Sequence, residues 1–386
     1  MTNNSDADEA AGQSVPPLCS PRVVGVAAVA LLVLLGGPLV SLLWPRSIPS
    51  TQDRTDVSAS AAGWVDEQRC ADCHEQSREF ALTGHANTLR PADDPESLKL
   101  LRELAESPLG QSESVAVMMP DGQPVGVRNA GKIRHSIPLH WCVGSGQHAR
   151  TWISTMPDAL GSMDLLEFRW TWFHSIADFV ATPGHPEAAG EGAIASLGLL
   201  FDGPRAWRCF SCHSSRLPVV DGVIDESGIH GGVTCQRCHG PRARHVATEG
   251  AYQDPAWILS DRDDSVARCA QCHRRADEQK PGTVRPDNPD IVRFQPIGLS
   301  QSKCYQQSQM SCTSCHDPHR PMASQNPRGI WQCVQCHDPA ATDHTLCGAG
   351  MADNCLDCHM PAVETVPHLP FTDHWIRVRQ ESELAR

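Results

Sequence analysis

The chain begins with a polar segment followed by a long apolar run. Residues 1–22 are polar, and the sequence from Val23 to Trp44 carries no charge. About 20 apolar residues match a membrane-spanning helix and exceed the apolar region of a cleavable signal peptide. We therefore expect a cytoplasmic tail at 1–22 and a transmembrane signal anchor at 23–44, with a cleaved signal peptide as the alternative. Residues 45–63, rich in Ser, Thr, Pro and Ala, are expected to form a linker.

Two hydrophobic periods alternate between residues 75 and 208. The segment Ser97–Glu106 has apolar positions at helical spacing and begins with a Ser suited to an N-cap. Apolar residues then recur at every second position on both sides of Asp121-Gly122, a dipeptide typical of hairpin turns. The stretch Phe168–Trp172 repeats this period of two. We expect one helix and a small β-rich lobe in this interval.

The rest of the chain is organised by one repeated pattern. CxxCH occurs seven times, and every CxxC in the sequence is followed by His. One copy precedes the β-rich interval, and six follow it. The copies are Cys70–His74, Cys209–His213, Cys235–His239, Cys269–His273, Cys312–His316, Cys333–His337 and Cys355–His359.

The CxxCH spacing has a specific chemistry. Two thiols one turn apart can form thioethers with the two vinyl groups of a haem, and the following imidazole can bind the iron. Zinc ribbons have no reason to place His after every CxxC, and a two-residue gap suits a redox pair better than a structural disulfide. We therefore predict seven covalently attached c-type haems. The thioether residues are Cys70, Cys73, Cys209, Cys212, Cys235, Cys238, Cys269, Cys272, Cys312, Cys315, Cys333, Cys336, Cys355 and Cys358, and the proximal ligands are His74, His213, His239, His273, His316, His337 and His359.

Composition indicates where the apolar core comes from. A chain of 386 residues with only 2 Tyr and 8 Phe has little aromatic carbon to bury, and seven haems would supply the missing bulk. We expect a mainly α fold with extensive loops and a small β-rich lobe, arranged around a stacked haem array. The predicted lobes are 64–208, with one haem, and 209–386, with six.

The contexts of several motifs carry a family resemblance. CxxCHGP at 235–241, CxxCHDPH at 312–319, CxxCHMP at 355–361 and FTDHW at 371–375 resemble the multihaem cytochrome c superfamily, which includes tetrahaem cytochrome c-554, pentahaem nitrite reductase and octahaem hydroxylamine oxidoreductase. The resemblance covers residues 64–386 and implies closely stacked, mostly bis-His haems that conduct electrons. No motif ends in Lys, as at the catalytic haem of the nitrite reductase, so a catalytic assignment does not transfer.

The resemblance also implies distal ligands from outside the motifs. His148 follows a Gly-rich turn that can approach a flat macrocycle. His319 lies too close to His316 to bind the same iron from the other face, so we expect it on a neighbouring haem. Twelve histidines lie outside the motifs, and their number alone selects none. The candidate distal ligands are His85, His148, His230, His245, His319, His368 and His374.

Charge and chemistry set the expected location and partners. The formal net charge of −13 argues against nucleic acid and suits basic electron-transfer partners, or reflects only an acidic soluble surface. Because haem is attached to CxxCH outside the cytoplasm, we expect a periplasmic body on a single-pass inner-membrane anchor. The predicted function is a membrane-anchored heptahaem c-type cytochrome that carries electrons between redox partner proteins or from a quinol-linked membrane donor.

The rival prediction is an enzyme. One iron with an open face would oxidise or reduce nitrogen or sulfur compounds, with His140 or Arg150 supplying protons or charge. Cys142, Cys304 and Cys347 lie outside the motifs. They allow one disulfide plus a free thiol, or three separate roles, one of which is a thiolate ligand on an open haem.

Overall fold

A computed structural model describes residues 63–111, 115–130, 133–157, 163–186, 190, 192–221, 223–259, 261–325, 328–337 and 355–379. Within these ranges no helix combines the length and the apolar character that a membrane crossing requires. The expected tail and transmembrane anchor lie outside the described residues. None of the described helices therefore supports the predicted single-pass inner-membrane anchor.

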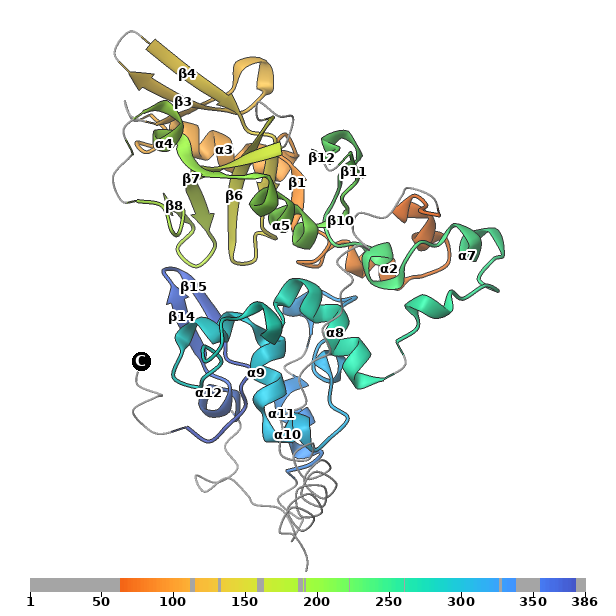
Figure 1. The fold of residues 1–386 in the computed structure, drawn as a ribbon. Helices are drawn as coiled ribbons and strands as arrows, with labels where there is room; N and C mark the ends of the chain where they lie inside the picture. Colours follow the sequence, from red (N-terminus) through yellow and green to blue (C-terminus); the bar gives the residue numbers. More distant parts are fainter. Residues whose placement is uncertain are drawn as a thin grey trace, which may run out of the picture. The chain divides into compact units, whose positions relative to one another are not determined.

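A six-stranded antiparallel sheet occupies the first half of the described chain (Figure 1). Its order is β1–β5–β6–β7–β8, and β9 also pairs with β7. The predicted strand at Phe168–Trp172 lies inside β7, whose Phe168 and Phe173 are fully buried. The strands are β1 (Leu89–Pro91), β5 (Trp141–Val143), β6 (Ala149–Pro157), β7 (Met163–Phe173), β8 (Asp178–Ala181) and β9 (Gly198–Phe201).

A three-stranded sheet contains the predicted hairpin. β2 (Ala116–Met118) pairs antiparallel with β3 (Val125–Ala130), which pairs in turn with β4 (Ile133–Pro138). Asp121 and Gly122 form the turn between the first two strands and have φ angles of 51° and 82°. These values lie in the left-handed region that Gly and Asp tolerate, so the hairpin prediction is confirmed.

The predicted helix in this lobe is α3 (Pro95–Glu106), and it begins earlier than expected. Its N-cap is Asp94, whose carboxylate accepts hydrogen bonds from the N–H groups of Glu96 and Ser97. Ser97 is instead buried, and its hydroxyl accepts a hydrogen bond from Trp152 Nε1 at 2.8 Å. The residue expected to cap the helix therefore joins it to β6.

The second half of the described chain consists of short elements (Figure 1). Three two-stranded sheets join β10 (Ser214–Arg216) to β13 (His230–Gly231), β11 (Val219–Val220) to β12 (Val223–Ile224) and β14 (Ala362–Val366) to β15 (Leu369–Thr372). The other α-helices are α2 (Gln76–Phe80), α4 (Ala193–Leu197), α5 (Gly203–His213), α6 (Cys235–His239), α7 (Ala243–Ala247), α8 (Arg262–His273), α9 (Gln295–Gln301), α10 (Lys303–Gln306), α11 (Arg328–Val334) and α12 (Cys355–His359). The 3₁₀ turns are η2 (Glu67–Asp72), η3 (Pro120–Gly122), η4 (Glu226–Gly228), η5 (Pro255–Trp257), η6 (Ala276–Glu278), η7 (Pro289–Arg293), η8 (Cys312–Ser314) and η9 (Met322–Ser324).

The prediction of a mainly α fold with one small β-rich lobe was wrong. Five separate sheets occur within the described residues, and their strands extend from Leu89 to Thr372. The physical reason is that the interval without haem motifs must bury its own apolar side chains, and its period-two pattern does so by forming sheets. The late hairpins are too short to leave a periodic signal.

Buried apolar side chains are distributed unevenly along the chain. Two clusters fill the β-rich part, and Trp152, Phe168 and Phe210 are among their fully buried members. The cluster in the motif-dense part is smaller and contains Val266, Ala267, Ala270, Leu299 and Tyr305. The region with most motifs therefore has the least protein core of its own.

Candidate haem-binding site

Each CxxCH motif forms one helical turn, either alone or at the end of a longer helix. The N–H of the motif histidine donates to the carbonyl of the first cysteine, as in His74 to Cys70 at 2.9 Å and His337 to Cys333 at 2.8 Å. Residues i, i+3 and i+4 of such a turn share one face. Both thiols and the imidazole can therefore reach the same macrocycle, as the covalent attachment of a haem requires.

The fold brings motif histidines to histidines that lie far away in the sequence. In the described part of the chain, every ring contact between two imidazoles joins a motif histidine to one of the predicted distal ligands. The centroid distances are 6.3 Å for His74–His245, 6.2 Å for His85–His273, 6.0 Å for His239–His319 and 6.1 Å for His316–His374.

These distances fit an iron held between the two rings. A metal–imidazole bond of about 2.0 Å on each side, plus about 1.1 Å from each nitrogen to its ring centroid, gives about 6.2 Å between centroids. Both ring planes contain the nitrogen–iron axis in such a complex, so the angle between them is unrestricted. The observed angles range from 14° for His239–His319 to 82° for His85–His273. The residues present therefore fit bis-His haem.

Hydrogen bonds fix the orientation of several rings. Five histidines place Nδ1 against a carbonyl oxygen, which can only accept, so Nδ1 donates its proton and Nε2 remains available for iron. Four acceptors are backbone carbonyls, and the fifth is a side-chain amide. The contacts are His213 to Thr88 O at 3.2 Å, His245 to Tyr252 O at 2.9 Å, His273 to Gln295 Oε1 at 3.2 Å, His359 to Arg377 O at 3.0 Å and His374 to Thr372 O at 2.9 Å.

Burial keeps many of these imidazoles in the neutral form that binds a metal. It lowers the pKa of His85 to about 4, with smaller contributions from the charges of His273 and His316. Burial is also the main cause of the lowered pKa values of His239 and His374. Protons therefore compete weakly for these nitrogens at neutral pH.

Motif cysteines from different copies also meet. Cys212 and Cys272 lie within hydrogen-bonding reach of each other, and so do Cys269 and Cys312. The Sγ atoms of Cys70 and Cys235 lie within 4.8 Å of each other and of a Glu67 oxygen. Each of these cysteines belongs to a CxxCH motif, so the predicted thioethers would leave the Glu67 cluster without thiolates for a separate metal. With haems attached at these cysteines, the contacts would bring the edges of neighbouring macrocycles together.

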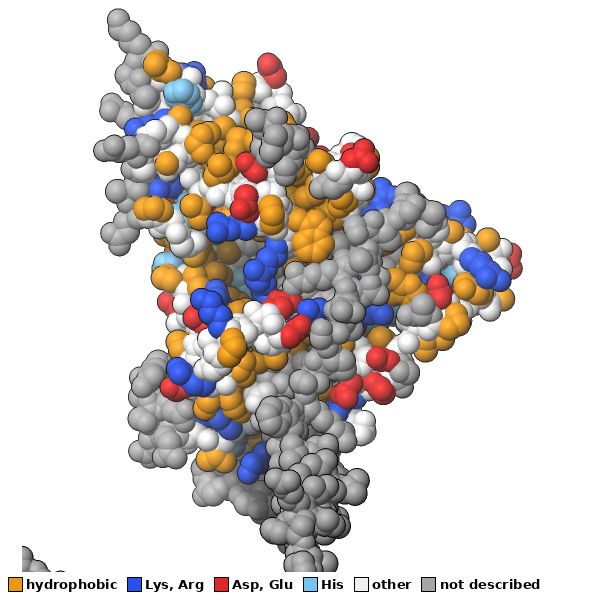
Figure 2. Space-filling model, viewed as in Figure 1, with side chains coloured by type: hydrophobic (Ala, Val, Ile, Leu, Met, Phe, Trp, Pro, Cys, Tyr) orange, Lys and Arg blue, Asp and Glu red, His pale blue; other side chains and the backbone are white. Residues whose placement is uncertain are grey.

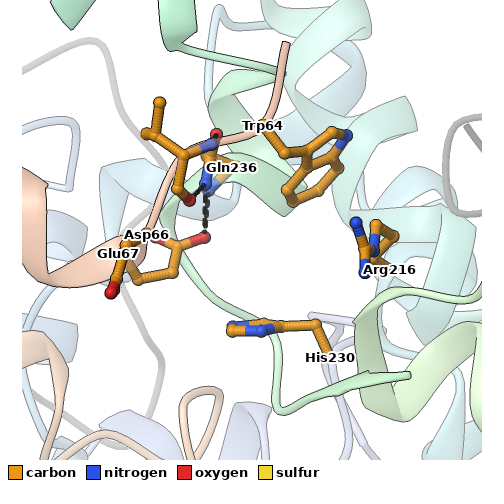
Figure 3. A pocket seen from close by; sticks show the side chains of 7 residues that line it. Trp64, Asp66, Glu67, Arg216, His230 and Gln236 are labelled. Atoms are coloured by element: carbon orange, nitrogen blue, oxygen red, sulfur yellow. Dashed lines mark hydrogen bonds between the residues drawn. The ribbon is translucent and has the colours of Figure 1, made fainter. Parts of the chain in front are cut away.

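Three predicted distal ligands have no imidazole opposite them among the described residues. They are His148, His230 and His368. His368 contacts the ring of Phe173, with centroids 5.5 Å apart. His230 lines a cavity of about 450 Å³ together with Trp64 and Arg216 (Figure 3). Val65, Glu67 and Gln236 also line this cavity. Gln236 Nε2 donates hydrogen bonds to Glu67 Oε1 at 3.0 Å and to the Val65 carbonyl at 2.7 Å.

The residues proposed for the enzyme alternative have structural contacts in the β-rich part. His140 Nδ1 accepts a hydrogen bond from the Thr155 N–H at 3.0 Å, and Arg150 pairs with Glu96 at 2.7 Å. The Arg150 contact lowers the pKa of Glu96. Within the described residues Cys142 and Cys304 are free thiols, so no disulfide joins them. Cys347 lies outside the described residues.

Sequence reasoning missed the residues that support the ligands. Gln295 holds His273, Glu67 links the first and third motifs through Gln236, and Arg237 contacts Gln271 in the next motif. Three of these residues, Gln236, Arg237 and Gln271, occupy variable positions of CxxCH. Their contacts with distant segments give those positions a role, and the motif itself contains no signal for it.

Comparison with known proteins gives one related sequence and one related structure. The chain is 25% identical over 192 residues to the multiheme cytochrome MtrA of Shewanella baltica (strain OS185), a match that covers 43% of this chain and 56% of that protein. The chain thus spans just over half the length of this relative. The crystal structure of the outer cell wall cytochrome OcwA matches 82% of this chain and 80% of that one, with 14% identity and a TM-score of 0.47. No family model matches the chain. The similarity to MtrA does not support the narrower likeness to cytochrome c-554, nitrite reductase or hydroxylamine oxidoreductase.

Proposed function

We propose that the chain is an electron-transfer cytochrome of the multihaem cytochrome c superfamily, a proposal that its similarity to a multiheme cytochrome supports. In this proposal the chain binds seven c-type haems and conducts electrons along them. One haem is attached at each CxxCH motif by two thioethers, with the motif histidine on the iron. The haem supplies a one-electron Fe(III)/Fe(II) couple. The protein supplies the spacing, the axial ligands and the electrostatic surroundings of each couple.

The observation that carries this proposal is the set of four imidazole pairs at 6.0–6.3 Å. Two strong axial ligands keep an iron six-coordinate, so its oxidation state changes with little movement of the ligands. Such a site suits electron transfer better than substrate binding. His245, His85, His319 and His374 are accordingly proposed as the distal ligands of the haems at His74, His273, His239 and His316.

The contacts between motif cysteines support conduction along the array. Sulfurs that meet across motifs bring together the edges of the macrocycles to which they are joined. Cys272 and Cys269 contact the second and the fifth motif, respectively. The haem at 269–273 is therefore proposed as a junction in the route. Electrons would pass through it between the two parts of the array.

Redox partner proteins are proposed as the donor and the acceptor, and a quinol-linked donor stays an expectation from the sequence. The net charge of −13 favours partners with a basic docking surface. Acidic, basic and apolar side chains are interspersed on the face shown in Figure 2. Docking is therefore expected to depend on local charge pairs as well as on net charge, and to weaken with added salt.

The test is to express the full chain with c-type maturation machinery and to count haems by intact mass. Spin-resonance spectra of the oxidised protein then count low-spin irons, and carbon monoxide is titrated into the reduced protein. Seven haem masses and at least four low-spin irons that do not bind the gas are expected. Fewer than seven attached haems would contradict the count, and a predominantly high-spin protein would contradict the bis-His proposal.

A second candidate function follows from two other motif histidines. Among the described residues, neither His213 nor His359 faces an imidazole at the bis-His spacing. Each ring is held at Nδ1 by a backbone carbonyl, so Nε2 can bind iron. An iron without a second protein ligand can accept substrate, and an oxidoreductase acting on a nitrogen or sulfur compound is the corresponding alternative. Carbon monoxide binding at one or two haems would favour this alternative.

A further inference from the structure

Arg237 is a buried cation inside a haem motif. It occupies the second variable position of Cys235–His239 and is 7% exposed. Its Nη1 donates a hydrogen bond to Gln271 Oε1 at 3.1 Å. Gln271 occupies the same position of the next motif and is 9% exposed. The contact therefore joins two haem-binding turns through their variable residues.

The surroundings of Arg237 lack the usual counter-charge. Two other buried arginines each pair with an adjacent carboxylate, Arg262 with Asp263 at 2.8 Å and Arg275 with Asp277 at 2.9 Å. No carboxylate of the described residues lies within ion-pair distance of Arg237, and its Nε has no hydrogen-bond partner there. Burying a charge without a partner is costly, so this arginine is a poor choice for stability alone.

Three haem anchors converge around this guanidinium. Cys238 directly follows Arg237, and Cys272 directly follows Gln271. Cys272 in turn lies within hydrogen-bonding reach of Cys212. Both Cys238 and Cys272 lie within electrostatic range of the Arg237 charge. Arg237 therefore lies near the anchored edges of the haems at motifs 209–213, 235–239 and 269–273.

We propose that Arg237 is a redox-tuning residue that raises the reduction potentials of these three haems. Reduction of Fe(III) adds one electron to the haem, and a buried positive charge stabilises that added electron. The effect is strong because the low-dielectric interior screens it little. This inference rests on the proposed haem array. It specifies how the protein would raise the reduction potentials of the haems at 209–213, 235–239 and 269–273 relative to the others.

The substitution Arg237→Gln removes the charge and keeps a hydrogen-bond donor toward Gln271. Arg237→Lys keeps the charge and changes the donor geometry. Gln271→Glu is an independent variant that leaves Arg237 in place and neutralises it with a carboxylate. Arg285→Gln is the matched control because Arg285 is 60% exposed and lies outside the motifs.

The experiment is a spectroelectrochemical titration of each fully loaded full-length protein, with haem number checked by mass. In Arg237→Gln and in Gln271→Glu, part of the titration curve should move to more negative potentials. In Arg237→Lys and in Arg285→Gln, the curve should stay near that of the parental protein. Unchanged curves in both charge-neutralising variants would overturn the inference. A shift in Arg237→Lys as large as in Arg237→Gln would do so as well, because the contact and not the charge would then be responsible. Absence of haem from these motifs in the parental protein would contradict the proposed function instead, and the mass measurement shows it separately.

Discussion

The rings of His74 and His245 lie nearly parallel, with centroids 6.3 Å apart and an angle of 16° between their planes. One belongs to the first haem motif, and the other follows the third motif on α7. Tyr252 O accepts a hydrogen bond from His245 Nδ1 at 2.9 Å, so Nε2 of this ring remains free for a metal. The pair has the spacing of two axial ligands on one iron, and His245 has the tautomer that such a ligand needs.

Replacing His245 with Ala should leave the haem at Cys70–His74 with one protein ligand. We expect one low-spin signal to disappear from the spin-resonance spectrum and one haem to become high-spin and to bind carbon monoxide when reduced. His135→Ala is the control, because His135 is exposed on β4 and lies outside the predicted ligand set. An unchanged spectrum for His245→Ala would rule out this ligand assignment.

Glu67 should affect the redox potential in the direction opposite to that of Arg237. Its carboxylate accepts hydrogen bonds from Thr234 Oγ1 at 2.6 Å and Gln236 Nε2 at 3.0 Å, beside the anchors Cys70 and Cys235. At an assumed separation of about 10 Å and an effective dielectric of about 20, a negative charge would raise the energy of an electron added to an iron by about 1.7 kcal/mol. This energy equals about 70 mV for one electron. Glu67→Gln should therefore move part of the titration curve by some tens of millivolts to more positive potentials.

The same titration provides the control for Glu67. Glu103→Gln changes an exposed carboxylate on α3 and should leave the curve in place. A negative shift in Glu67→Gln would contradict the electrostatic explanation.

Trp152 should contribute a buried hydrogen bond to the β-rich part. Trp152→Phe removes the 2.8 Å contact from Nε1 to Ser97 Oγ and should lower the free energy of unfolding by about 1–2 kcal/mol. Trp170→Phe is the matched comparison, because Trp170 Nε1 has no hydrogen-bond partner among the described residues. Urea unfolding, monitored by near-ultraviolet circular dichroism, measures the free energy of unfolding of both variants. Equal losses in the two variants would show that ring packing, and not the hydrogen bond, sets the cost.

The Cys142 thiol should not react with alkylating reagents in the folded protein. Burial raises the pKa of its thiol to about 11, so at pH 8 almost no thiolate forms, and the thiolate is the reactive species. Iodoacetamide at pH 8 should modify Cys142 only after unfolding, as peptide mass mapping would show. Rapid modification of the native protein would contradict the burial of this thiol.

The same pKa has a consequence for stability. Between about pH 9 and 11 the unfolded thiol ionises while the folded thiol stays protonated, so the unfolded state binds fewer protons. The free energy of unfolding should therefore fall as the pH rises through this window. Cys142→Ala should reduce that pH dependence relative to the parental protein.

The sequence predicts the haem anchors, and the structure adds which histidines lie opposite each other. The CxxCH spacing alone predicts the anchors and the proximal ligands, because both are local in the chain. Motif context selected His85, His245, His319 and His374 as distal candidates, but which motif each would face depends on the folding of distant segments. The pairing of His319 with His239 is an example, since His319 lies three residues after His316 of another motif.

The β-rich part was predicted in kind but not in extent. The Asp121-Gly122 turn and the alternation along β7 are local signals, and both led to correct elements. The pairs β10–β13 and β14–β15 consist of two to five residues per strand, which is too short for a periodic pattern. The burial of Arg237 depends on its contact with α8, and its own position in the sequence does not reveal it.

The four histidine pairs would also act as crosslinks once iron is bound. Each joins residues far apart in the sequence, and the loops they close, 74–245, 85–273, 239–319 and 316–374, overlap along the chain. On the chain-entropy model a crosslink that closes about 100 residues stabilises the folded state by about 4.7 kcal/mol. The surplus of histidines should also slow refolding. In an unfolded, haem-loaded chain each iron can bind many imidazoles that are not its ligands in the folded protein. Refolding of the loaded protein should therefore be limited by ligand exchange and accelerate when excess free imidazole competes for the iron.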